Sequence, residues 1–428
     1  MSIFTPLYTG ASGLGAHGDA IGIVGDNIAN ASTIGYKASR ASFEDTLGGA
    51  ASNGQRFGNG VRMGGPETLF GQGSLQNTGN SLDFAIQGNG FFEVAGTHGG
   101  VNGNYFTRDG RFQLDSKGTV VNAEGLRLQG YTVDGTGSLG TSVGDLNLAG
   151  QESPPHATSS AVVATNLDSN STAVAAAFSP ADPVGTSSFQ TSMTIYDSLG
   201  NSHRADIYFR NQGSGSWDWH AMVDGADVGG TAGTPTQIAD GTLTFTTTGA
   251  LDTETTASSS ASFVGATANQ AIAFDFGDSI TTDSGTGLAG TTQFSGASSV
   301  THISQDGYGA GMLTDMQVDD DGTIMGQFSN GQRRAVARVA IAEFASPENL
   351  GRAGNQLFAD NQASGPPLLG AAGTGGRGSI AGGALEGSNV DLGTELVTLI
   401  AYQRAYQANA RTVTTSDEIL QEIANLKR

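Results

Sequence analysis

"NVDLGTELVTLIAYQRAYQANARTVTTSDEILQEIANLKR", residues 389–428, carries an apolar residue at every seventh position. The members of this stripe are Leu392, Leu399, Tyr406, Val413 and Leu420. Because no Gly or Pro follows Gly393, the spacing predicts one continuous helix of about 50 Å at 1.5 Å per residue. Ser388, Asn389 and Asp391 are candidate N-caps. Such a helix is longer than a small domain can bury.

A second apolar stripe lies near the other end of the sequence, with its members alternately four and three residues apart. They are Ile3, Leu7, Gly10, Leu14, His17, Ile21, Val24, Ile28 and Ala31. Thr5 followed by Pro6 predicts the start of a helix, and Gly35 predicts its end. Its six glycines each cost roughly 0.8–1 kcal/mol relative to Ala, about 5–6 kcal/mol in total. We therefore expect this helix to be mostly unfolded on its own.

Between the two stripes the apolar period changes to two, and turn signals multiply. Asp321-Gly322 and Asn330-Gly331 predict the turns of a three-stranded meander, and Leu199-Gly200-Asn201 predicts another hairpin. Pro154-Pro155 and the run at 281–292 mark the expected edges of an inner β-rich domain. The predicted fold class is mixed and mainly β, with two β-rich domains, one inserted in the other. Both are attached to a third domain, in which the N- and C-terminal helices pair in the manner of a coiled coil.

The expected domain organisation has four parts. The helical core domain comprises residues 1–35 with 389–428, and linkers or connecting regions comprise 36–80 and 366–388. One β-domain comprises residues 81–153 with 287–365, and the inserted outer β-domain comprises 154–286.

Composition excludes several classes of function. The 428 residues include 19 Lys and Arg against 40 Asp and Glu, a formal net charge of -21, which disfavours phosphate backbones and anionic lipid. The absence of Cys excludes disulfides, thiolate metal sites and a Cys nucleophile. The first twenty residues lack the pattern of a cleaved secretion signal, and no apolar run of about 18 residues occurs. We expect no nucleic-acid partner and no membrane-embedded segment.

Motifs for catalysis or ligand binding are weak. The six His residues show no HExxH or other short ligand spacing. The stretch at 318–323, VDDDGT, suits calcium less well than a hairpin turn, because the final Glu of a calcium loop is missing. Residues 140–144 match the G-x-S-x-G pattern of a hydrolase, but neither a strand before them nor a helix after them is predicted. The glycine-rich run at 373–378 is better explained as linker. The sequence therefore predicts no catalytic, cofactor-binding or metal-binding residue.

The two helical stripes favour assembly as the function. They can pair with each other, and apolar surface left over must be buried by neighbouring copies. The predicted assembly residues are Leu7, Leu14, Ile21, Ile28, Leu392, Leu399, Tyr406, Val413 and Leu420. Burial contributes about 1.5–3 kcal/mol for each Leu or Ile, so these nine side chains outweigh the glycine deficit. We expect the helices to fold as copies assemble.

Sequence signatures at both ends of the chain resemble those of the axial proteins of the bacterial flagellum, the family of rod, hook and hook-junction proteins. The residues that carry the resemblance are Asn30, Thr33, Gly35, Tyr36, Lys37, Asn389, Val390, Asp391, Gln403, Arg404, Tyr406 and Asn409. The stretch at 106–131 resembles the β-domain shared by rod and hook members. The stretch at 194–209, with an insertion of over a hundred residues, resembles the hook members.

The resemblance implies a homopolymer, a curved hollow helical tube that serves as a universal joint passing torque from motor to filament. It implies location in the hook of the flagellum after type III export without a cleaved signal. The implied partners are the distal rod protein, the hook cap, the hook–filament junction protein and the flagellar type III export apparatus. No cofactor and no enzymatic activity are implied.

Three other functions compete with this interpretation. A distal rod subunit belongs to the same class of assembly, but the length of the chain and its inserted domain oppose it. A secreted β-rich surface enzyme is opposed by the lack of a visible acid/base cluster, although paired carboxylates cannot be recognised without a fold. An adhesin or pilin-like fibre is expected to carry a cleaved signal.

Overall fold

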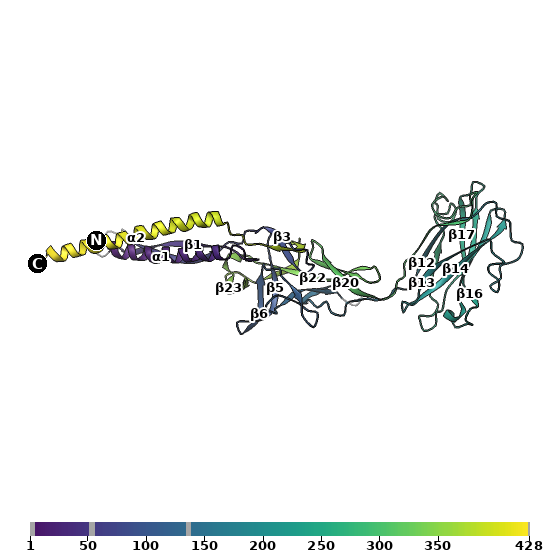
Figure 1. Ribbon diagram of the computed structural model, residues 1–428, viewed down its shortest axis with the longest axis horizontal. Helices are drawn as coiled ribbons and strands as arrows, with labels where there is room; N and C mark the ends of the chain where they lie inside the picture. Colours follow the sequence, from purple (N-terminus) through teal and green to yellow (C-terminus); the bar gives the residue numbers. More distant parts are fainter. Residues whose placement is uncertain (1–4, 51–55, 134–137, 427–428) are drawn as a thin grey trace. The chain divides into compact units, whose positions relative to one another are not determined.

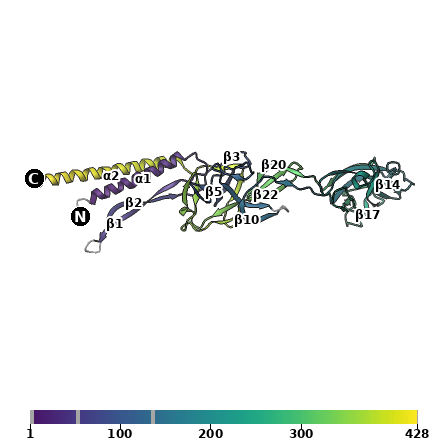
Figure 2. The same ribbon diagram turned by 90° about the horizontal axis from the view of Figure 1, so that it is seen from below.

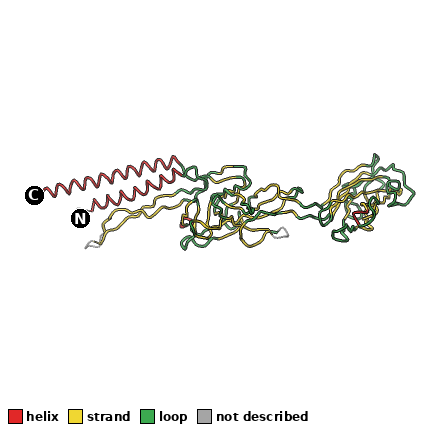
Figure 3. Tube along the Cα trace, turned by 60° about the horizontal axis from the view of Figure 1, so that its bottom comes forward, coloured by secondary structure: helices red, strands yellow, loops and turns green. Residues whose placement is uncertain are grey.

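The computed structural model describes residues 5–50, 56–133 and 138–426, and Figure 1 shows its elements in chain order. The predicted fold class is confirmed: strands dominate, with one long helix near each end of the chain, α1 (Thr5–Ala29) and α2 (Leu392–Leu426). Figure 3 shows the same elements by colour, with helices in red and strands in yellow. Two compact units are present. Unit 1 comprises Met1–Gln151, Thr314–Gln327 and Arg333–Arg428, and unit 2 comprises Glu152–Leu313 and Phe328–Gln332.

These bounds differ from the expected ones. Residues 152–153, 287–313 and 328–332 lie in unit 2, and strand β19 (Ser299–Gln305) pairs there with β12 (Ser160–Asn166). Within the expected connecting region 36–80, β1 (Ser39–Ala50) and β2 (Arg56–Thr68) form a long hairpin. Turn signals in the sequence show where strands end but not which strands pair, so these differences were not predictable.

Helix α1 begins at the expected residues but ends at Ala29, well before Gly35. The Asn30 side chain donates to the carbonyl of Asp26 over 2.9 Å, and turns follow. Figure 2 shows hairpin β1–β2 running beside α1. Ser12 Oγ accepts a hydrogen bond from the Val61 amide over 3.2 Å, which fixes the hairpin to the helix.

Besides the hairpin, unit 1 contains one large sheet and two small two-stranded sheets, and one of its core clusters is rich in Phe. The strands, apart from the hairpin, are β3 (Leu75–Asn77), β4 (Phe84–Gln87), β5 (Phe91–His98), β6 (Val101–Thr107), β7 (Gln113–Leu114), β8 (Val120–Val121), β9 (Arg127–Val133), β10 (Leu139–Asp145), β20 (Gly311–Val318), β21 (Thr323–Phe328), β22 (Arg333–Glu343), β23 (Gly351–Gly354), β24 (Leu357–Ala359), β25 (Leu368–Ala371), β26 (Ser379–Gly382) and β27 (Ala384–Glu386). The central order is β20-β21-β22-β9-β5-β6-β24-β23. The predicted turns at Gly322 and Gly331 join β20, β21 and β22, and both glycines have a φ of 80°.

Unit 2 contains two sheets around one hydrophobic core. Strands β13 (Phe189–Tyr196), β14 (Ser202–Gly213), β15 (Ser216–Asp224), β16 (Pro235–Phe245) and β17 (Leu251–Ser259) form an antiparallel meander. A smaller sheet has the order β18-β12-β19, with β18 at Ala273–Asp275, and β11 is at Glu152–Ser153. Side chains alternate across the meander, so Ile207 and Phe209 of β14 pack with Trp217 and Trp219 of β15 in the core. These are the only two Trp residues of the chain.

Glu254 on β17 makes the stability of unit 2 dependent on pH. Burial raises the pKa of Glu254 to about 7, helped by Asp275 and Asp283 and opposed by a hydrogen bond from the Phe276 amide. A carboxyl whose pKa is raised on folding stabilises the fold below its unfolded pKa of 4.5 and loses that contribution as pH rises towards 7. We expect Glu254→Gln to stabilise unit 2 at pH 8 by about 1 kcal/mol, a value discounted because the side chain is only partly buried.

The measurement is urea unfolding followed by Trp fluorescence, because Trp217 and Trp219 report on unit 2 alone. The stabilisation should be present at pH 8 and vanish at pH 4. Glu152→Gln, at an exposed carboxyl of the same unit, controls for the loss of one charge. A gain of equal size at both pH values would contradict the assignment.

Candidate functional site

The two helices of unit 1 lie side by side and approach closely at a face of small residues on α1 (Figure 1). The buried residues of this face are Gly10, Gly13, Ala16, Ala20, Val24 and Asn27. A Cβ atom added at Gly13 would lie 2.6 Å from Oδ1 of Asn409, and one at Gly10 would lie 2.9 Å from Cγ2 of Val413. Glycine at these two positions therefore permits the close packing of α1 on α2, which offsets part of its cost to the helix.

The apolar stripes lie at the margins of this contact. Leu7, Leu14, Ile21 and Ile28 of α1 are half-buried, as are Leu399, Val413 and Leu420 of α2. Leu392 and Tyr406 are exposed by 48% and 42% of their surface. Gly10 and Val24 of this face belong to the stripe seen in the sequence, whereas Gly13, Ala16, Ala20 and Asn27 were not predicted as contact residues.

Helix α2 begins where the sequence indicated. Asp391 is its N-cap, since its Oδ1 accepts from the Thr394 amide over 3.0 Å. Val390 is half-buried, while Gln403 and Arg404 are exposed. The polar motif residues of α2 thus point mostly away from α1, except for Asn409, which lies against Gly13.

Asn27 is a buried polar centre that joins three elements. Its Nδ2 donates to the carbonyl of Ser39 over 2.7 Å and to Oε1 of Glu395 over 3.1 Å. Its Oδ1 accepts from the Ser39 amide over 2.9 Å and from the Tyr36 hydroxyl over 3.3 Å. One side chain therefore fixes α1 to β1 and to α2. This role was not predicted from the sequence, because an Asn within a helix carries no local signal of burial.

The turn after α1 requires glycine. Gly35 has a φ of 68°, and a Cβ there would lie 2.5 Å from the Asp109 amide nitrogen. Its own amide donates to the carbonyl of Glu386 over 2.8 Å. The Thr33 hydroxyl donates to Oδ1 of Asn30 over 3.0 Å and closes the turn. The structure thus brings these motif residues together against the β-sheet of unit 1.

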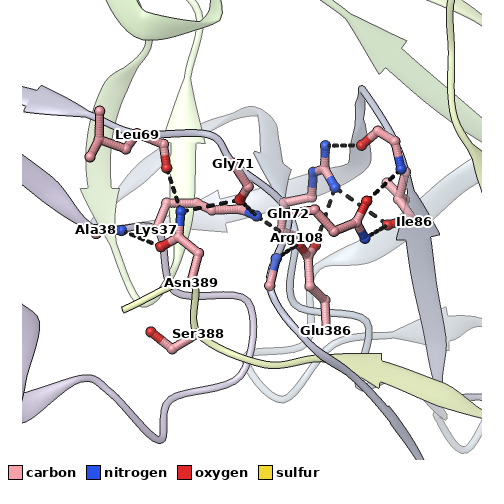
Figure 4. Close-up of polar contacts among 12 residues, drawn as sticks. Lys37, Ala38, Leu69, Gly71, Gln72, Ile86, Arg108, Glu386, Ser388 and Asn389 are labelled. Atoms are coloured by element: carbon pink, nitrogen blue, oxygen red, sulfur yellow. Dashed lines mark hydrogen bonds and ion pairs between the residues drawn. The ribbon is translucent and has the colours of Figure 1, made fainter. Parts of the chain in front are cut away.

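Beyond this turn lies a buried ionic junction, which Figure 4 shows in detail. Nζ of Lys37 is 2.7 Å from Oε1 of Glu386, and both side chains are fully buried. Nη1 of Arg108 is 3.2 Å from the other carboxylate oxygen, Oε2. The Gly73 amide donates to Oε1 over 2.8 Å, and Nζ of Lys37 donates to the carbonyl of Gly71 over 2.8 Å. One carboxylate therefore holds together segments at residues 37, 73, 108 and 386.

Charge burial is costly in this junction. Burial lowers the pKa of Lys37; Glu386 opposes this and Arg108 adds to it. Burial likewise lowers the pKa of Arg108 in spite of Glu386. Because both pKa values are lowered, the attraction of one carboxylate does not fully offset the free-energy cost of removing two cations from water.

Asn389 and Gln72 complete the junction with backbone hydrogen bonds (Figure 4). Oδ1 of Asn389 accepts from the Ala38 amide over 2.8 Å, while its Nδ2 donates to the carbonyl of Leu69 over 2.8 Å. Nε2 of Gln72 donates to the carbonyl of Ile86 over 2.7 Å. The segments entering and leaving the helix pair are thereby tied to one another and to the sheet.

Most polar groups of these contacts pair with one another, although Nε of Arg108 and Oγ of Ser39 are buried without a hydrogen-bond partner. Among the described residues no group of three or more His, Asp or Glu side chains is arranged to hold a metal ion. Neither described helix combines the length and the hydropathy of a membrane span.

Four protein-family models match the chain. "Flagella basal body rod protein" matches residues 7–37 and "Flagellar hook protein FlgE/F/G D1 domain" matches 85–168. "Flagellar basal body protein FlaE D2 domain" matches 166–308 and "Flagellar basal body rod FlgEFG protein C-terminal" matches 381–426. A helix pair joined to β-rich units and these matches define a structural protein of the flagellar rod and hook class.

Relatives that match almost the whole chain identify the family within this class. The flagellar hook protein FlgE of Escherichia coli (strain K12) is 35% identical over 420 residues, which cover 97% of this chain and 98% of the relative. That of Borreliella burgdorferi is 32% identical over 463 residues, covering 98% and 99%. The crystal structure of Helicobacter pylori flagellar hook protein FlgE2 covers 71% of this chain and 98% of its own, at 16% identity and a TM-score of 0.47. The chain belongs to the flagellar hook protein family.

Proposed function

We propose that this chain is the subunit of a curved, hollow helical tube, the flagellar hook, which acts as a universal joint between motor and filament. The family supports a structural role and homopolymeric assembly. The observation that carries the proposal further is the apolar surface of α2 that α1 leaves uncovered. It comprises Leu392, Leu396, Val397, Ile400, Tyr406, Ile419 and Ile423, each exposed by at least 42%.

A single copy leaves this surface in water, where it is unfavourable. We assign its burial to neighbouring copies, so that the helix pairs form the inner wall of the tube. In this proposal residues 1–35 with 389–428 are the core domain, and the stripe residues of both helices contribute to contacts between copies. The β-rich units then lie further from the tube axis.

The proposed role in the hook also implies particular protein partners. The tube meets the distal rod protein at one end and the hook–filament junction protein at the other, and a hook cap guides its growth. Export through the flagellar type III apparatus requires an unfolded chain, and the glycine-rich α1 is a weak helix on its own. The conformational entropy that the helices lose on folding is then offset only by the contacts that form between copies on assembly.

The test combines electron microscopy with circular dichroism over a range of protein concentrations. We expect curved hollow tubes in concentrated protein and a helical signal that is weak in dilute monomer and rises as tubes form. Straight tubes would favour the rod alternative. A chain that forms no tubes and is fully helical at every concentration would contradict the proposal and favour a protein that acts alone, such as a secreted β-rich surface enzyme.

A further inference from the structure

Several exposed charged side chains of the helix pair have no ion-pair partner among the described residues. They include Asp19 and Asp26 on α1 and both Arg residues of α2, Arg404 and Arg411. No residue of opposite charge lies one helical turn away from any of them. Elsewhere in unit 1 exposed charges do pair, as Arg40 does with Glu67 over 2.8 Å and Arg62 with Glu44.

The two Asp residues on α1 and the two Arg residues on α2 have the same spacing along their helices. Asp19 and Asp26 are seven residues apart, as are Arg404 and Arg411, so each pair lies along one face of its helix about 10 Å apart. Within one copy the two helices run antiparallel, since Gly13 lies against Asn409 and Asn27 bonds to Glu395. Copies related by a rotation about, and a translation along, a tube axis parallel to the helices keep this polarity.

We propose that α1 of one copy docks against α2 of a neighbouring copy in the register that pairs Asp26 with Arg404 and Asp19 with Arg411. This inference rests on the proposed function and names the contact through which copies meet. With antiparallel helices the equal spacing lets both ion pairs form at once. The occupant of each face is thus a second copy of the same chain, and the contact is heterologous, so it propagates into a helix instead of closing as a two-fold dimer.

The residues between the charges fit this register. Ala408 lies opposite Gly22, between the two ion pairs, and Ala401 lies opposite Ala29 beyond one of them. All four residues are exposed within a single copy, and a Cβ added at Gly22 would meet no atom within 4 Å. These two positions thus place a small residue against another small residue, which permits the close approach that short ion pairs require. This explains why α1 keeps glycine on a face where its own chain makes no contact.

The register also fixes an axial offset. Within one copy Asn27 is level with Glu395, whereas the proposed pair sets its neighbour Asp26 against Arg404. The adjacent copy is therefore displaced along the helices by about eight residues, roughly 12 Å. A neighbour without this displacement would place Gly22 level with Ile400, next to Ala401, and neither ion pair would form.

Charge exchange tests the ion pairs. Asp19→Lys/Asp26→Lys and Arg404→Glu/Arg411→Glu should each raise the critical concentration for tube formation at least about tenfold, because like charges then face each other across the contact. Combining all four substitutions should restore most of the wild-type value. Sedimentation measures the critical concentration, and circular dichroism of each monomer checks that unit 2 and the sheet of unit 1 remain folded. One-sided variants that assemble like wild type, or a four-fold variant no better than they are, would overturn the proposal.

Disulfide trapping tests the register without altering the charges, and the chain has no Cys of its own to interfere. Oxidised tubes of Gly22→Cys/Ala408→Cys should give a ladder of covalent oligomers in denaturing gels. The control Gly22→Cys/Ala401→Cys, which an undisplaced neighbour would link, should give none. The reverse pattern overturns the proposed register and leaves the hook function intact. Wild-type protein that forms no tubes contradicts both.

Discussion

Replacing Glu386 by Gln is expected to lower the free energy of unfolding of unit 1 by about 3–5 kcal/mol. The substitution removes the only carboxylate that faces Lys37 and Arg108 among the described residues and leaves two cations without a counter-charge. Both side chains are buried, so water cannot replace the lost partner. The segments that lead into α1 and out of α2 would lose their common anchor.

Far-UV circular dichroism during urea unfolding measures this change, because it reports on both units. Trp fluorescence provides an internal control, since Trp217 and Trp219 lie in unit 2 and their transition should stay in place. Lys37→Met is the informative comparison. It leaves a neutral pair of Glu386 and Arg108 and should cost less than Glu386→Gln. A loss below about 1 kcal/mol for Glu386→Gln would show that the junction does not depend on charge balance.

The second large effect is on assembly. Val397→Glu should raise the critical concentration for tube formation about 100-fold, equivalent to roughly 3 kcal/mol per contact. Val397 is the most exposed of the large apolar residues of α2, at 69%. Its burial between copies contributes about 1.5 kcal/mol or more, and a carboxylate in its place would have to be desolvated as well.

A matched control exists in the same unit. Val101 on β6 is exposed to almost the same extent, 65%, but lies outside the helix pair. Val101→Glu should leave assembly within about twofold of wild type and so separate loss of helix contacts from a general effect of surface charge. Both variants should unfold in urea at the wild-type midpoint. Equal loss of assembly in both would count against the helix pair as the main contact surface.

The contacts in the structure give a physical reason for several motif residues at the two ends of the chain. Gly35 permits a close approach to Asp109 with a left-handed backbone, Lys37 and Asn389 hold the junction, and Asp391 caps α2. Arg404 is exposed and has no ion-pair partner among the described residues of its own copy. The proposed pairing with Asp26 of a neighbour gives it one.

The sequence by itself determined the elements whose signals are local. The seven-residue stripe and the lack of Gly and Pro after Gly393 predicted α2, and Asn330-Gly331 predicted a hairpin turn, because helix periodicity and turn geometry depend on neighbours in the chain. Only the tertiary structure decided which glycines of α1 face α2, that residues 36–80 pair as a hairpin, and that Lys37, Arg108 and Glu386 meet in one buried junction. Such contacts join residues tens to hundreds of positions apart, and their energy comes from burial and charge pairing, which no local pattern encodes.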